Sequence, residues 1–123
     1  MGDSDVRVLV VDDLDDSAQM LAALLSVSGY AARTARDGAS ALAVTEEFKP
    51  HCVLLDVKMP GMDGLELAQR LRAAHGDDIV LIAVTAADID DFAVSQTFEL
   101  VDHYLVKPVD IAKLAAILPL VAG

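Results

Sequence analysis

The sequence has a single cysteine, Cys52, and therefore can form no disulfide within the chain. Proteins of this kind are typical of a reducing compartment. The sequence also lacks any apolar run close to the roughly 20 residues that cross a bilayer. Its first residues, MGDSDVRVLVV, carry acids where a secretory signal peptide has positive charges. These absences predict a soluble, cytoplasmic protein that does not associate with a membrane.

Basic side chains are scarce as well. Lysine and arginine total 9 against 20 aspartates and glutamates, which gives a net charge of −11. Such a surface repels the phosphates of DNA and RNA, so we expect no direct nucleic acid binding. Most of these acids are interpreted as an ordinary solvated surface. With 123 residues, 54% of them apolar, the chain is expected to form a single domain with an ordinary core.

Short apolar runs alternate with amphipathic segments along the chain, and they predict strands and helices respectively. The expected strands cover residues 6–11, 30–35, 52–55, 79–84 and 104–106. The expected helices cover about 17–28, 39–48, 64–75, 88–100 and 110–118. This alternation predicts an α/β fold in which helices cover both faces of a parallel sheet. Half a barrel is the alternative, but it leaves sheet edges exposed, so we favour an open, doubly wound sheet.

Two sulfur-containing side chains are expected in the core. Met20 lies at helical spacing with Leu21, Leu24 and Leu25 in the first expected helix. Cys52 begins the third expected strand, and an unpaired cysteine is among the most buried residue types.

Polar side chains follow four of the five expected strands. Asp12 and Asp13 follow the first, Asp56 the third, Thr85 the fourth and Lys107 the fifth. An open parallel sheet binds its ligands at the carboxyl ends of the strands. Three carboxylates gathered there repel one another and need positive charge nearby, which a lysine and a divalent cation supply. Oxygen ligands of this kind suit Mg²⁺.

Asp56 is the candidate chemical centre because it alone ends the central strand, where a nucleophile is shielded yet reachable. A carboxylate can attack phosphorus to form an acyl phosphate, while Lys107 and a metal neutralise the transferring group. Thr85 can donate its hydroxyl to that group. A simpler interpretation stays open: Asp12 and Asp13 can act as helix caps, and Lys107 can be a solvated surface lysine.

Taken together, these residues resemble the receiver domain of bacterial two-component response regulators. The matching motifs are the aspartate pair after VRVLVV, the block LLDVKMPGMDG, the dipeptide TA and the segment YLVKP. The resemblance covers residues 6–118 and treats 1–123 as one receiver domain without an output domain. It implies the flavodoxin-like (βα)5 fold with strand order 2-1-3-4-5.

The resemblance also implies a ligand set. Asp56 would be the phosphoacceptor. Asp13 and Asp56 would bind Mg²⁺ directly and Asp12 through a water molecule. The backbone carbonyl of Lys58 would complete the protein ligands.

A second group of residues would carry the response. By resemblance, Lys107 pairs with the phosphoryl group, Thr85 moves toward it, and Tyr104 turns inward. The surface formed by 88–100, 104–106 and 110–118 then shifts its population. The donor would be a histidine kinase or a histidine phosphotransfer protein, and the reader a downstream protein or output domain. A phosphorylation-dependent homodimer is a further expectation.

Other functional classes fit the sequence less well or stay open. Phosphatases of the haloacid dehalogenase type also use an aspartate nucleophile, but they need a second aspartate two residues later, where this chain has Lys58. The chain is therefore expected not to be an enzyme. A flavin or nucleotide carrier would need a phosphate-binding loop after the first strand, where the acidic DDLDDS repels phosphate. A degenerate receiver that binds a partner without phosphorylation stays open.

Overall fold

The computed structural model describes residues 6–13, 15–56, 64–85, 100–106 and 111–117. Its five strands are β1 (Arg7–Val11), β2 (Ala31–Ala35), β3 (Cys52–Asp56), β4 (Val80–Thr85) and β5 (His103–Val106). Every neighbouring pair is parallel, and the order across the sheet is β2-β1-β3-β4-β5. This confirms the open, flavodoxin-like sheet and the predicted strand order.

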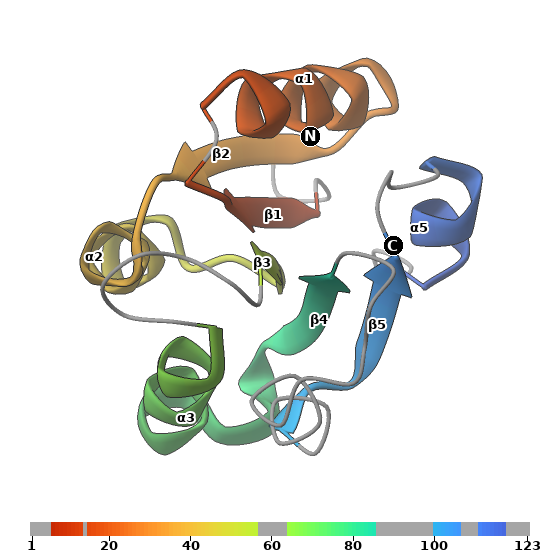
Figure 1. Cartoon of the computed structure of the whole chain (residues 1–123). Coiled ribbons are helices and arrows are strands. Elements are labelled where there is room, and N and C mark those ends of the chain that lie inside the picture. The colour runs from red at the N-terminus through yellow and green to blue at the C-terminus, as the bar shows by residue number, and fades with distance from the viewer. Residues whose placement is uncertain (1–5, 14, 57–63, 86–99, 107–110, 118–123) are drawn as a thin grey trace.

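Helices cover both faces of this sheet (Figure 1). The described helices are α1 (Asp15–Val27), α2 (Gly38–Phe48), α3 (Gly64–His75) and α5 (Ile111–Ile117), with a short 3₁₀ turn, η2 (Gly76–Asp78). Helices α1 and α5 pack on one face and contribute Ala18, Leu25 and Leu114 to its core. Helices α2 and α3 pack on the other face. The expected helix 88–100 lies, apart from its last residue, outside the described residues.

The three central strands, β1, β3 and β4, are mostly apolar because both of their faces are buried. Their successive residues largely alternate between the two cores. The outer strands β2 and β5 are less buried. In β3, Leu54 belongs to the core under α1 and α5, whereas Val53 and Leu55 belong to the core under α2 and α3. All five residues of β3 are buried, so the strand that carries Asp56 lies at the centre of the molecule.

The ends of helix α2 show how local sequence sets an element's limits. Asp37 caps its first turn, and the Oδ1 atom accepts a hydrogen bond from the Ser40 N–H at 2.7 Å. That hydrogen bond lowers the pKa of Asp37 below its usual value. At the other end Lys49 adopts a left-handed conformation with φ 52°, and its N–H donates to the carbonyl of Thr45. The helix therefore ends at Phe48, as the sequence predicts.

Helix α1 corrects one prediction and refines another. It begins at Asp15 rather than at Ser17. The prediction that Met20 lies in the core is wrong, because 68% of its surface is exposed. Leu21 and Leu25 face the sheet, and Met20 precedes Leu21 by one position, which turns its side chain about 100° around the helix axis. Cys52, by contrast, is confirmed as fully buried.

None of the helices among the described residues is long and apolar enough to cross a membrane.

Candidate metal centre

Three aspartates meet where two central strands end. Asp56 is the last residue of β3, while Asp12 and Asp13 directly follow β1. Strands β1 and β3 are parallel neighbours in which Val11 lies opposite Leu55, so they end side by side. The N–H of Asp12 donates to the carbonyl of Ala35 at 3.0 Å, which extends the sheet and fixes the backbone at this point.

One carboxylate oxygen from each aspartate lies within 4.8 Å of the others. Asp12 and Asp56 are only 7% and 8% exposed, and Asp13 is partly buried. Carboxylates this close repel one another, and a bound cation offsets the repulsion. Three hard oxygen donors at this separation fit Mg²⁺ or a similar divalent ion.

The structure brings together Asp12, Asp13 and Asp56, as the sequence predicts. Thr85 ends β4, the neighbour of β3, so its backbone lies at the same edge of the sheet. Tyr104 lies on β5 and is 53% exposed. Lys58 and Lys107 lie outside the described residues, so their roles stay predictions.

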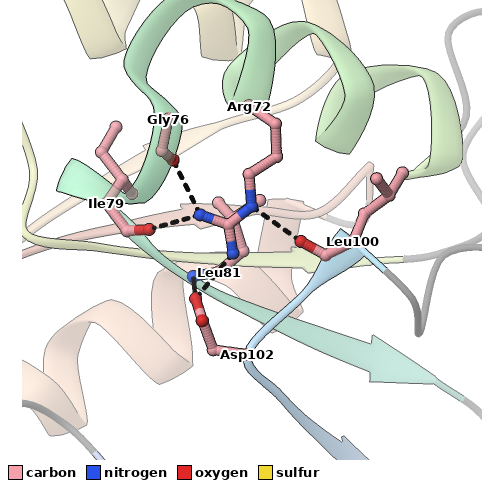
Figure 2. Close-up of polar contacts among 6 residues, drawn as sticks. All are labelled: Arg72, Gly76, Ile79, Leu81, Leu100 and Asp102. Atoms are coloured by element: carbon pink, nitrogen blue, oxygen red, sulfur yellow. Dashed lines mark hydrogen bonds and ion pairs between the residues drawn. The ribbon is translucent and has the colours of Figure 1, made fainter.

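A second polar cluster, the Arg72 cluster, lies at the opposite edge, where β4 and β5 begin (Figure 2). The Arg72 guanidinium donates to the carbonyls of Leu100, Gly76 and Ile79 at 2.8, 2.8 and 3.0 Å. It also forms an ion pair with Asp102 at 2.8 Å. The same Asp102 oxygen accepts a hydrogen bond from the N–H of Leu81 at 2.9 Å.

The environment of Asp102 acts on its pKa in both directions. Partial burial raises it, but the hydrogen bond from Leu81 and the Arg72 ion pair outweigh burial and hold it below its usual value. Sequence reasoning missed this cluster. Its only local signal is a basic residue in the last turn of α3, which is favourable in any helix.

Comparison with known proteins settles the family. A family model described as the response regulator receiver domain matches residues 8–119. The chain belongs to this family. Receiver domains of response regulators are parts of two-component systems, and they are generally signalling switches rather than enzymes.

Relatives and solved structures of receiver domains agree with this assignment. "Response regulator MprA" of Mycobacterium sp. (strain KMS) is 40% identical over 111 residues, which are 90% of this chain and 48% of that protein. The chain thus spans about half the length of the curated relatives it matches.

Two solved structures are similar over most of their length. A CheY-like receiver domain from Methylobacillus flagellatus is 31% identical with a TM-score of 0.82, covering 92% of this chain and 95% of its own. Response regulator protein TrrA from Thermotoga maritima, solved in complex with Mg(2+)-BeF, is 32% identical with a TM-score of 0.79 and coverages of 90% and 94%.

Proposed function

We propose that this receiver domain is the phosphoacceptor switch of a two-component phosphorelay and that Asp56 accepts the phosphoryl group. The observation that carries the proposal is the position of Asp56. Its carboxylate ends the central strand, is 8% exposed, and lies within 4.8 Å of two further carboxylates. Family membership supports the same assignment.

The proposed reaction needs no proton transfer at the nucleophile, because Asp56 attacks as a carboxylate. One of its oxygens bonds to phosphorus while the bond from phosphorus to the donor's imidazole nitrogen breaks. The electron pair of the broken bond returns to that nitrogen. The proposed donor is a phosphohistidine on a histidine kinase or a histidine phosphotransfer protein.

Asp12, Asp13 and Asp56, with the backbone carbonyl of Lys58, would hold Mg²⁺. When bound, the ion supplies positive charge that neutralises the phosphoryl oxygens as they transfer. Asp12 and Asp13 flank the acceptor and set where that charge lies. We assign Lys107 to the bound phosphoryl group because it comes next in the sequence after Val106, where β5 ends at the same edge of the sheet.

The proposed output lies on β5 and its neighbours. Thr85 moves toward the phosphoryl group and Tyr104, half exposed on β5, turns inward. The surface formed by 88–100, β5 and α5 then shifts its population toward a state that a downstream protein, an output domain or a second copy of the chain reads. The net charge of −11 supports a protein reader rather than direct nucleic acid binding.

We also propose that residues 1–123 form one receiver domain, with its core in 6–118, and that this domain works in the cytoplasm. The single buried cysteine supports that location.

The test is intact mass spectrometry after incubation with Mg²⁺ and acetyl phosphate, and separately with a phosphorylated histidine kinase. We expect the wild type to gain one phosphoryl group and Asp56→Asn to gain none. Asp102→Asn is the matched control, because it changes an aspartate at the opposite edge and should still gain the group. Equal gain in Asp56→Asn would refute the assignment. No gain from either donor, with the fold intact, would favour a receiver that acts without phosphorylation.

A further inference from the structure

A pocket of about 340 Å³ opens at the amino end of the sheet, away from Asp12, Asp13 and Asp56. Its lining includes Arg7, the first residue of β1, and His51 and Ile79, which directly precede β3 and β4. The ends of helices α2 and α3 supply the other walls. The volume lies in the range of small-molecule sites. The proposed phosphoryl transfer uses none of these residues.

Two basic residues, Arg7 and Lys49, line the pocket, although the chain has only 9 lysines and arginines in all. The Nε atom of Arg7 donates to the backbone carbonyl of Lys49 at 2.9 Å, which holds the guanidinium against the end of α2. A guanidinium has five N–H donors, so most of this group stays available for a planar acceptor. Lys49 is the second basic residue that lines the pocket.

His51 adds a neutral donor. Its Nδ1 atom accepts a hydrogen bond from the backbone N–H of Arg7 at 2.9 Å, so Nδ1 carries no proton and the neutral ring keeps its hydrogen on Nε2. Burial, and then the charge of Arg7, lowers the pKa of His51 and favours this neutral form. An imidazole in this tautomer donates a hydrogen bond from Nε2 and does not ligate a metal there. The wall therefore favours a ligand that accepts hydrogen bonds.

The opposite charges in the pocket limit how negative that ligand can be. Glu46 and Asp78 also line it, and the Nε2 atom of His75 lies 3.2 Å from the Glu46 carboxylate. Two carboxylates balance the two cations, so a doubly charged phosphate meets repulsion that a singly charged group largely avoids. A carboxylate also matches the planar donor fork of arginine. Buried Pro50 and Ile79 offer apolar contact for a short chain.

From this arrangement we infer that the pocket is a binding site for a small organic monocarboxylate. Its charged end would lie against Arg7, Lys49 and the Nε2–H of His51. The site is separate from the Asp56 edge, and its occupancy does not require phosphorylation.

The test is an NMR titration with sodium butyrate as probe, at ionic strength held constant with sodium chloride. We expect saturable shifts of the His51 and Lys49 resonances. Lys49→Gly and Arg7→Gln should each raise the apparent Kd at least about fivefold, as loss of one charge-assisted contact predicts. Lys113→Gln, at an exposed position of α5, should leave it unchanged, and so should Asp56→Asn.

Lys49→Gly separates binding from folding. Glycine suits the left-handed conformation that Lys49 adopts. The melting temperature of the Lys49→Gly variant should therefore equal or exceed that of the wild type. Absence of saturation overturns the inference, as does an unchanged Kd in both pocket variants. Inorganic phosphate that shifts the same resonances at lower concentration than butyrate overturns the choice of ligand class.

Discussion

The two edges of the sheet use charge in opposite ways. At the carboxyl edge, Asp12, Asp13 and Asp56 bring three carboxylates within 4.8 Å. At the amino edge, the Arg72 cluster places one guanidinium against three carbonyls and the carboxylate of Asp102. The first arrangement gathers like charges, which favours a bound cation, whereas the second pairs opposite charges and stabilises the fold. The comparison separates a candidate metal centre from an ion-pair cluster that maintains the shape of the fold.

The largest expected effect follows from breaking the Arg72 cluster. Arg72→Leu should lower the free energy of unfolding by about 3 kcal/mol, because it removes the guanidinium donors to the three carbonyls and the ion pair with Asp102. Urea denaturation measures it. Arg70→Leu, two residues earlier on the same helix α3, is the control. The Arg70 side chain is 56% exposed, and its only ion pair among the described residues is with Glu66. Its loss should therefore cost less than about 0.5 kcal/mol. Equal costs would show that the Arg72 contacts contribute little.

The carboxyl edge should respond to magnesium instead. At a free concentration of about 100 times its Kd, Mg²⁺ should raise the free energy of unfolding by about 2.7 kcal/mol. Sodium chloride at equal ionic strength controls for simple screening of the repulsion. Asp13→Asn should lose most of the gain, while Asp102→Asn should keep it. A gain that sodium chloride reproduces in full would argue against a specific site.

The two edges also differ in how far the sequence predicts them. The carboxyl edge was predictable because each strand of a parallel sheet ends at the same side, so Asp12, Asp13 and Asp56 meet whatever the details of packing. The Arg72 cluster was not, because it depends on where helix α3 ends and on carbonyls at Gly76, Ile79 and Leu100, which sequence does not distinguish from any others.

Side-chain burial on helices shows a similar limit. Leu25 and Met20 are both apolar and both fit a helical spacing, yet Leu25 is fully buried and Met20 is 68% exposed. Periodicity identifies a helix and the approximate direction of its apolar face, but the angle at which α1 meets the sheet decides which residues at the margin are covered. The pocket beside His51 is not predictable from the sequence for a related reason, since only the folded chain brings Arg7 beside Lys49 and His51.

The same substitution, aspartate to asparagine, should change the free energy of unfolding in opposite directions at the two edges. Asp13→Asn, measured without magnesium, should raise the free energy of unfolding by roughly 0.5–1 kcal/mol, since it removes one of three mutually repelling charges. Asp102→Asn makes the same chemical change at the amino edge. It should lower the free energy by about 1 kcal/mol because a charged acceptor of Arg72 and Leu81 becomes neutral. The same sign for both substitutions would contradict the contrast between the edges.

The smallest expected effect is the pH dependence of the Asp102 contribution. Its pKa in the folded protein lies below the ordinary value of 3.8, so the carboxylate stabilises the fold fully above about pH 4. This stability is lost as the pH falls through the lower, folded pKa. The difference in free energy of unfolding between the wild type and Asp102→Asn should therefore shrink as the pH falls from 7 to about 3. The part that disappears should be below about 1 kcal/mol, since solvent screens a carboxylate that is 43% exposed.

Urea denaturation of both proteins across this range measures the difference. A difference that stays constant down to pH 3 would assign the role of Asp102 to the shape of its side chain rather than to its charge.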